Sequence, residues 1–278
     1  MGRVCVVNET NRERPAFGRL LRHWRSLRGL SQLALAQDVE TTTRHLSYIE
    51  NGRSRPGRDL VLRLAEALDL PLRSRNELLG AAGLAAAFPE NQIEGALLVP
   101  YRRAVLGVMD AVNPFPAFAV DAAFNLREAN RAARLMLAGA RDMSDSNPTE
   151  GAPHNLVDAF LAPGPGRAQI ANFPEVAWSW HARLLRASAG RPSESQASVE
   201  LRKRVESYLR EVPRPPFDGS GDPVICPTFR IGEQLVRTIG MTMRFGPSRE
   251  VTLEELTVDL LYPRDAEAEA FFHALAAS

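Results

Sequence analysis

The stretch Leu30–Pro56, LSQLALAQDVETTTRHLSYIENGRSRP, decides how the first part of this chain folds. Ser31 and Thr42 are both suited to begin a helix, because their hydroxyls accept hydrogen bonds from the free N–H groups of a first helical turn. Apolar residues then recur three and four positions apart, as they do on the buried side of a helix. The residues expected to face inward are Leu35, Ala36, Val39, Leu46 and Ile49. The stretch therefore predicts two short helices joined by a tight turn, the second ending at Gly52.

Further helices are predicted on both sides of this pair. Pro15 suits the start of a preceding helix, whose apolar stripe would be Phe17, Leu20, Leu21 and Trp24. Asp59–Leu70 and Arg73–Gly83 show helical periodicity after it. Residues 15–87 are thus expected to form an all-α bundle of five helices, preceded by a flexible leader over residues 1–14.

The second helix of the quoted stretch has a polar outer face. Its outward residues are expected to be Thr43, Arg44, Ser47 and Tyr48, and Arg53, Arg55 and Arg58 follow it. Between Arg12 and Asp59 there are ten arginines against five acidic residues, although the whole chain carries a net charge of only +1. Such a face can reach base edges in a major groove, and flanking arginines can meet phosphates. A bundle that only contacts other proteins is the alternative.

Four segments within residues 30–53 match a known pattern. The matching segments are Leu30-Ser31-Gln32, Leu35-Ala36, Leu46-Ser47 and Ile49-Glu50-Asn51-Gly52-Arg53. In these segments the chain resembles the Xre-type, lambda-repressor-like helix-turn-helix family. The sequence departs from that family at Glu40, where glycine is common, and at Leu33, where an acidic residue is common.

The resemblance implies roles for individual residues. Base contacts are expected from Thr43, Arg44, Ser47 and Tyr48. Phosphate contacts are expected from Gln32, Thr42, Asn51, Arg53 and Arg55. Arg25 would pair with Glu50 and tie the preceding helix to the reading helix. The implied partner is double-stranded operator DNA, bound by a homodimer.

The remaining two thirds of the chain read as a second domain behind a linker over residues 88–100. Short strands are predicted at Ala117–Val120 and Phe124–Arg127, followed by helices. Longer strands are predicted at Val224–Ile231, Gln234–Phe245 and Leu256–Tyr262, before a closing helix at Asp265–Ala277. This order is typical of a PAS-like antiparallel sheet with flanking helices, so the fold class is α+β multidomain.

Residues 101–278 also resemble the ligand-binding domain of the MmyB-like regulators. The matching segments are Pro114-Phe115-Pro116-Ala117, Asn125 to Ala133, Asn155-Leu156, Ala171 to Val176, Phe245-Gly246, Thr252 to Leu256 and Tyr262-Pro263. The resemblance implies a PAS-like fold and a small apolar ligand, such as a fatty acid, in place of a cofactor.

Large apolar side chains in this domain are candidates to line an apolar cavity, or else are ordinary core. They are Phe118, Phe124, Trp178, Trp180, Phe229, Met241, Met243 and Phe245. Arg237, Arg244 or His181 could meet a ligand carboxylate, with solvated surface as the alternative reading. Met241 and Met243 lie two positions apart on one predicted strand and therefore share a face.

Catalytic chemistry has little support in the sequence. The five histidines are scattered, and neither metal-ligand spacing nor a phosphate-binding glycine loop is present. Two cysteines and the lack of an apolar leader or an apolar run of membrane-spanning length favour a cytoplasmic protein without a membrane partner. We therefore expect a transcription regulator that senses a ligand. The alternative is a helix-turn-helix protein-interaction module with a PAS-like dimerisation domain and no ligand.

Overall fold

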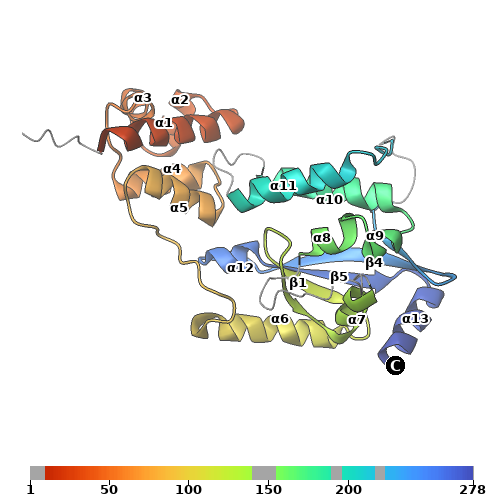
Figure 1. Ribbon diagram of the computed structural model, residues 1–278. Helices are drawn as coiled ribbons and strands as arrows, with labels where there is room; N and C mark the ends of the chain where they lie inside the picture. Colours follow the sequence, from red (N-terminus) through yellow and green to blue (C-terminus); the bar gives the residue numbers. More distant parts are fainter. Residues whose placement is uncertain (1–9, 140–154, 189–195, 217–222, 278) are drawn as a thin grey trace, which may run out of the picture. The chain divides into compact units, whose positions relative to one another are not determined.

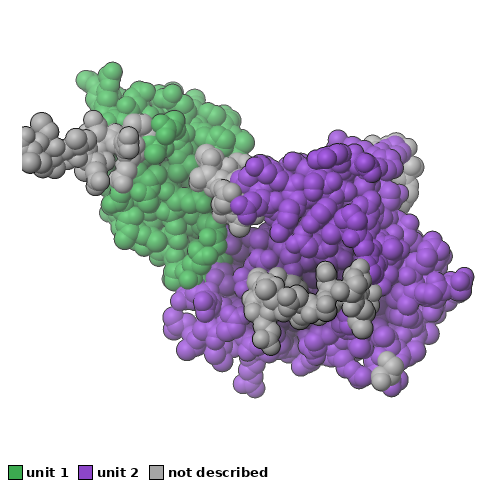
Figure 2. Space-filling view, in the orientation of Figure 1, with its two compact units in different colours: residues 1–90, 190–193, 249–251 green, residues 91–189, 194–248, 252–278 purple. Residues whose placement is uncertain are grey.

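The computed structural model describes residues 10–139, 155–188, 196–216 and 223–277 (Figure 1). The chain divides into two compact units, which Figure 2 distinguishes by colour. The N-terminal unit consists of residues 1–90 with 190–193 and 249–251, and the C-terminal unit contains the rest. One unit is all-helical and the other is a sheet with helices, so the predicted α+β class is confirmed.

The N-terminal unit is the predicted bundle of five helices. They are α1 (Thr10–Leu27), α2 (Gln32–Asp38), α3 (Thr43–Glu50), α4 (Arg58–Ala67) and α5 (Leu72–Ala81). The predicted stripe of α1 is buried together with the inward residues of α2 and α3 in one core. The prediction that a flexible leader extends to residue 14 is wrong, because α1 already begins at Thr10. Residues 1–9 lie outside the described part of the chain.

The starts of α2 and α3 are set by the predicted caps. The Ser31 hydroxyl accepts a hydrogen bond from the Ala34 N–H, and the Thr42 hydroxyl accepts one from the His45 N–H. Between the two helices, Glu40 has a φ of 53°. This is the left-handed conformation that glycine adopts without steric cost, which explains why glycine is common in this turn. Glu40 fits there at the expense of some backbone strain.

The C-terminal unit is built on a five-stranded antiparallel sheet with the order β2-β1-β5-β4-β3. The strands are β1 (Ala117–Val120), β2 (Leu126–Ala129), β3 (Thr228–Ile231), β4 (Gln234–Arg244) and β5 (Thr257–Pro263). Its helices are η1 (Ala96–Leu98), α6 (Val99–Ala111), α7 (Arg131–Gly139), α8 (Leu156–Leu161), α9 (Pro165–Ala168), α10 (Phe173–Ser188), α11 (Gln196–Leu209), α12 (Val251–Glu255) and α13 (Ala266–Ala277). Neither α9 nor α12 was predicted from the sequence.

The two faces of this sheet have separate cores. Ala119 of β1 pairs with Val258 of β5, which pairs with Met243 of β4, and all three belong to the face that α6 covers. Phe118 points to the opposite face because side chains alternate along a strand. There it packs into the larger core that includes residues of α7, α8, α10 and α11. Figure 1 shows α6 on one side of the sheet and α10 with α11 on the other.

The predicted linker is partly structured. Ile93 and Leu98 are buried in the core under α6. The helix α6 begins at Val99, two positions before the predicted start at residue 101. The expectation of an unstructured linker through residue 100 is therefore wrong for its second half.

Asn130 joins three elements of the C-terminal unit through a buried amide. Its Oδ1 accepts hydrogen bonds from the N–H groups of Ala117 at 3.1 Å and Ala133 at 3.0 Å. Its Nδ2 donates to the carbonyl oxygens of Met109 at 3.2 Å and Phe115 at 2.8 Å. Asn130 thus caps the start of α7, and the same amide links α6 and β1 to this helix. All its polar capacity is satisfied, as a buried amide requires.

Candidate nucleic-acid interface

The apolar side of α3 packs into the bundle, and its polar side faces solvent. Leu46 and Ile49 are buried in the bundle core. Arg44 is exposed, while Thr43, Ser47 and Tyr48 are half-buried. Because these four positions fall at i, i+1, i+4 and i+5, they lie along one side of the helix. The four residues predicted to contact bases are thus brought together on one polar face.

The side chains of this face are ordered by contacts along the helix. Arg44 Nε donates to the Tyr48 hydroxyl at 3.0 Å, and its guanidinium carbon lies 5.4 Å from the centre of the Tyr48 ring. Ser47 Oγ accepts a hydrogen bond from Asn51 Nδ2 at 3.3 Å. The two Nη groups of Arg44 have no hydrogen-bond partner among the described residues. They can donate in parallel to guanine O6 and N7, which is the commonest specific contact to a base.

Glu50 is the anchor that ties α3 to the rest of the bundle. Its side chain is inaccessible to solvent. Arg25 donates to its two oxygens from Nε at 2.7 Å and from Nη2 at 3.2 Å. Gln32 Nε2 donates at 2.7 Å and Arg22 Nε at 3.3 Å. Four N–H groups from α1 and α2 therefore converge on one carboxylate of α3.

This arrangement sets the charge state of Glu50. Burial alone would raise the pKa of its carboxyl. The hydrogen bonds from Arg25 and Gln32, the charge of Arg25 and the hydrogen bond from Arg22 outweigh that effect and hold the pKa below its ordinary value. Glu50 is thus an ionised, paired group near neutral pH. Its partners leave few of its lone pairs unsatisfied, which a buried charge requires.

The residues predicted to contact phosphates fall into two groups. Gln32, Thr42 and Asn51 already hold α3, since Gln32 bonds Glu50, Thr42 caps the helix and Asn51 accepts from Arg22 Nη2 at 3.0 Å. Each keeps a further N–H or O–H that can donate to a phosphate. Arg53 is exposed, and its side chain has no hydrogen bond or ion pair within the described residues.

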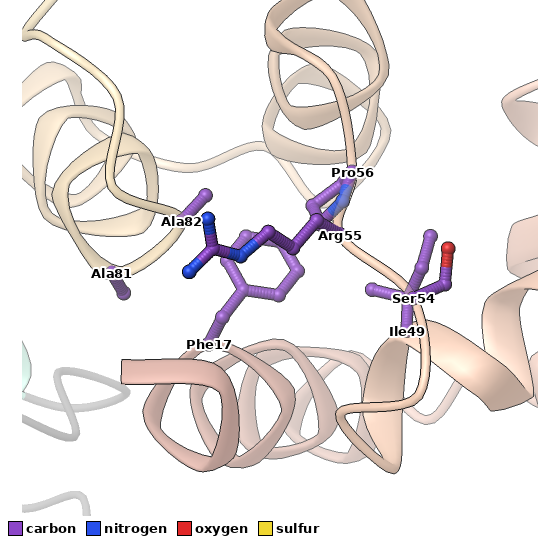
Figure 3. A pocket seen from close by; sticks show the side chains of 7 residues that line it. All are labelled: Phe17, Ile49, Ser54, Arg55, Pro56, Ala81 and Ala82. Carbon is purple, nitrogen blue, oxygen red and sulfur yellow. The ribbon is translucent and has the colours of Figure 1, made fainter. Parts of the chain in front are cut away.

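Arg55 lies differently from Arg53. Its side chain crosses a small depression lined by Phe17, Ile49, Ser54, Arg55, Pro56, Ala81 and Ala82. Figure 3 shows the guanidinium directed across the Phe17 ring toward Ala82 at the end of α5. A phosphate contact from Arg55 requires its side chain to swing away from this position. Arg58, the next arginine, donates from Nη1 to the Ala85 carbonyl at 2.8 Å and so stabilises the bundle.

Sequence reasoning missed Gly18 on α1. A Cβ atom at this position would lie 2.1 Å from the Glu50 carbonyl oxygen and 2.7 Å from its carbonyl carbon. Only glycine therefore allows α1 and α3 to cross this closely. The sequence signal for this crossing was a glycine in the middle of an amphipathic helix, where glycine lowers helix stability by about 1 kcal/mol relative to alanine.

The residues predicted to line one apolar cavity are divided between the two faces of the sheet. Phe118, Phe124 and Phe229 are buried in the larger core, and Trp178 packs at its edge with its Nε1 donating to the Val212 carbonyl. Met243 and Phe245 lie on the face that α6 covers. The prediction of a single shared cavity is wrong. Side chains alternate between the two faces along each strand, and Phe118 of β1 points to the opposite face from Met243 of β4.

An open apolar groove runs between α6 and the sheet in the C-terminal unit. Its volume is about 200 Å³, and its lining consists of Ala104, Val105, Val108, Met243, Arg244, Phe245, Leu256 and Val258. Arg244 is the one charged residue of that lining. Of the other candidates for a ligand carboxylate, Arg237 bonds Asp265 at 3.3 Å and His181 packs edge-on against Trp178. Met241, on the same face, is 43% exposed.

Models of known protein families match parts of both units. A family model described as the MmyB-like transcription regulator ligand binding domain matches residues 101–275, more than half of the chain. The chain belongs to this family. A second model, described as a helix-turn-helix domain, matches residues 16–78, which include α2 and α3. This MmyB-like protein is therefore a DNA-binding transcription regulator with a ligand-binding domain. The Xre type of its helix-turn-helix stays a prediction.

A solved structure matches a smaller part of the regulator. The crystal structure of the clp gene regulator ClgR from Corynebacterium glutamicum matches with 22% sequence identity and a TM-score of 0.23. The match covers 37% of this chain and 95% of that chain. No curated protein matches the sequence. Within the described residues, no helix of the regulator has the length and apolar character needed to cross a membrane.

Proposed function

We propose that this regulator binds operator DNA as a homodimer, with α3 of each copy in a major groove, and that its C-terminal unit senses a small apolar ligand without acting as an enzyme. The observation that carries the proposal is the outer face of α3. It combines an exposed arginine with three hydrogen-bonding side chains, and it is fixed to the bundle through Glu50. This polar, rigidly held face suits base edges in a major groove, which offer hydrogen-bond donors and acceptors.

The proposed roles of the residues follow from their positions. Thr43, Arg44, Ser47 and Tyr48 read base edges, with Arg44 making the strongest discrimination. Arg53 meets a phosphate directly, and Gln32, Thr42 and Asn51 add donors beside it. Arg25 and Glu50 hold α3 in register with the rest of the unit. In a homodimer the two copies of α3 would meet half-sites about one helical turn of DNA, roughly 34 Å, apart or a multiple of it.

Substitution of two arginines distinguishes base recognition from phosphate binding. Arg44→Ala should cost about 1–3 kcal/mol of binding to the preferred sequence and little on random DNA, because it removes a base contact. Arg53→Ala should weaken binding to all duplexes alike and lower the salt slope by about one. Fluorescence anisotropy over a salt series, with a duplex from the upstream region of the regulator's own gene and a shuffled duplex, measures both.

Arg230→Ala provides a matched control, since Arg230 is an exposed arginine on β3 in the C-terminal unit. It should leave both affinities unchanged. Wild-type affinity of Arg44→Ala and Arg53→Ala for both duplexes would remove α3 from the DNA interface. In that case the interaction-module alternative becomes the better account of the bundle.

The ligand part of the proposal rests on the groove beside α6. Its lining is apolar except for Arg244 at the end of β4. An aliphatic chain with an acidic head fits this groove if the Arg244 side chain, which strand alternation directs to the other face, turns toward it. Octanoate should bind the purified regulator more tightly than octanol does, and Arg244→Gln should remove about a tenfold advantage. Isothermal titration measures these affinities, and native mass spectrometry reports any co-purified acid. If octanoate and octanol bind equally well, Arg244 does not hold a carboxylate.

A further inference from the structure

Hydrogen bonds along α3 decide which polar groups its outer face has left for a base. Arg44 Nε donates to the Tyr48 hydroxyl, and Asn51 Nδ2 donates to Ser47 Oγ. Both hydroxyl oxygens therefore already accept one hydrogen bond. Their O–H groups have no acceptor among the described residues, and neither do the two Nη groups of Arg44. The outer face thus offers mainly donors to a base.

Arg22 of α1 fixes the direction of the hydrogen bond to Ser47. A guanidinium can only donate, so the Asn51 atom that lies 3.0 Å from Arg22 Nη2 is the oxygen Oδ1. The amide nitrogen of Asn51 is then turned toward Ser47. Arg22 is itself held by Glu50, to which its Nε donates at 3.3 Å. Three hydrogen bonds therefore connect the buried carboxylate of Glu50 to the hydroxyl of Ser47.

Tyr48 fixes the Arg44 side chain in a similar way. Its hydroxyl accepts from Arg44 Nε at 3.0 Å, and its ring centre lies 5.4 Å from the guanidinium carbon. With Nε occupied, Arg44 has its two Nη groups left for a pair of acceptors. A side chain that is ordered before DNA binds loses less conformational entropy in the complex.

The four bases differ in the acceptors that they expose in the major groove. Guanine offers two acceptors, O6 and N7, and thymine offers one, O4, beside its methyl group. Cytosine offers a donor, and adenine offers one donor and one acceptor. A face of donors therefore matches guanine best and thymine next. It leaves the cytosine amino group without an acceptor, and an unpaired buried donor weakens binding.

We infer that α3 selects guanine opposite Arg44 and guanine or thymine opposite Ser47, with Asn51 and Tyr48 as the positioning residues that set the direction of these bonds. The inference rests on the proposed DNA-binding function and names the bases that it recognises. The second N–H of Asn51 stays available for a phosphate, and the O–H of Tyr48 stays available for a base.

Base analogues test the acceptors of the guanine opposite Arg44 with the wild-type chain. That guanine is the position of a selected duplex at which Arg44→Ala loses the preference. Its replacement by 7-deazaguanine removes N7 and should weaken binding about fivefold or more, because one Arg44 Nη group loses its acceptor. Inosine keeps O6 and N7 and is the matched control, expected to bind within about twofold of guanine.

Fluorescence anisotropy measures these affinities. Arg44→Ala should bind the 7-deazaguanine and inosine duplexes equally well, since it has no guanidinium to pair with N7. Equal binding of the two analogue duplexes by the wild-type chain would overturn the assignment of guanine to Arg44.

Asn51→Asp tests the hydrogen bond that sets Ser47. A carboxylate cannot donate, so the Ser47 O–H should turn to donate to it and leave the Ser47 oxygen to accept from DNA. The base preferred opposite Ser47 should then change from guanine or thymine to cytosine or adenine, by about fivefold in relative affinity. The ranking of four duplexes that differ at this position measures the change, because the added negative charge weakens binding to all four.

Gln37→Glu on α2 is the control for that charge, since Gln37 is exposed in the same unit. It should keep the wild-type ranking of the four duplexes. An unchanged ranking in Asn51→Asp would overturn the role of Asn51 in setting Ser47.

Tyr48→Phe tests the positioning of Arg44. It keeps the ring and removes the acceptor of Arg44 Nε, so the preference for guanine opposite Arg44 should fall about threefold to tenfold. In the double variant with Arg44→Ala, this preference should be no lower than in Arg44→Ala alone, because Tyr48 acts on that base through Arg44. Additive losses would overturn the positioning role of Tyr48.

The failure of the inference can be told apart from the failure of the proposed function. Specific binding to a duplex with cytosine or adenine at both positions would overturn the inference and leave DNA binding standing. A wild-type chain that binds all duplexes alike would overturn the proposed function as well.

Discussion

Gly18→Ala is expected to destabilise the N-terminal unit strongly and to weaken DNA binding. The added Cβ would lie 2.1 Å from the Glu50 carbonyl oxygen, far inside van der Waals contact, and the obstructing atoms belong to the backbone of α3. Relief requires α1 and α3 to separate, which would pull Arg22 and Arg25 away from Glu50. We expect a loss of about 3 kcal/mol or more of unfolding free energy, at or above the upper range for overpacked cores.

Urea denaturation of the full chain, followed by circular dichroism, measures this loss. Gly80→Ala is the matched control, since Gly80 is a glycine of α5 in the same unit, and an added Cβ there would meet no described atom within 4 Å outside its own helical backbone. It should be neutral or stabilising by up to about 1 kcal/mol. Equal stability of Gly18→Ala and Gly80→Ala would contradict the close crossing of α1 and α3.

Glu50→Ala should destabilise the N-terminal unit by about 3–5 kcal/mol at neutral pH, because it leaves the buried end of Arg25 without its carboxylate. Glu50→Gln should lose a large part of the same energy, since an amide accepts fewer hydrogen bonds and carries no charge. Denaturation midpoints in urea report both losses. Glu66→Gln, an exposed glutamate of α4, should change stability by less than about 0.5 kcal/mol.

The pH dependence of Glu50 has a definite sign. Its pKa is lower in the folded chain than the ordinary value of 4.5, so ionisation of Glu50 stabilises the fold above that value. The contribution is lost as the pH falls through the lower folded pKa. The stability difference between the wild type and Glu50→Gln should therefore be largest near neutral pH and shrink below about pH 4. A difference that is constant from neutral pH down to about pH 3 would show that the Glu50 charge does not stabilise the fold.

Local signals in the sequence were enough to predict α1 to α5 and most strands. Hydrophobic periodicity located the helices, and Ser31 and Thr42 marked two of their starts. These features depend on residues close together in the chain. The outer face of α3 was predictable for the same reason, because the positions of Thr43, Arg44 and Ser47 around a short helix follow from its period.

Features that depend on distant residues were not predictable in this way. The family resemblance implied a phosphate contact for Gln32, and the fold also brings its amide to Glu50, eighteen positions away. Gly18 has meaning only once α3 crosses it. The cavity prediction failed because alternation shows that Met241 and Met243 share a face without showing which helix covers that face. Pairing across β1, β5 and β4 decides this, and no local pattern contains it.

In the proposed function, the C-terminal unit senses a ligand and the N-terminal unit binds DNA in response. For a ligand in the groove to alter DNA binding, it must bind one dimer geometry more tightly than another. Octanoate added during sedimentation of the wild-type chain would show whether the dissociation constant of the dimer changes.

The most direct test of the central claim is selection of bound sequences from a pool of random DNA duplexes by the purified full chain. We expect enrichment of an inverted repeat whose half-site centres lie about one helical turn, roughly 34 Å, or a multiple of it apart. We also expect that Arg44→Ala loses the preference at one position of each half-site. A selected pool no different from the starting pool would contradict the assignment of α3 as the reading helix.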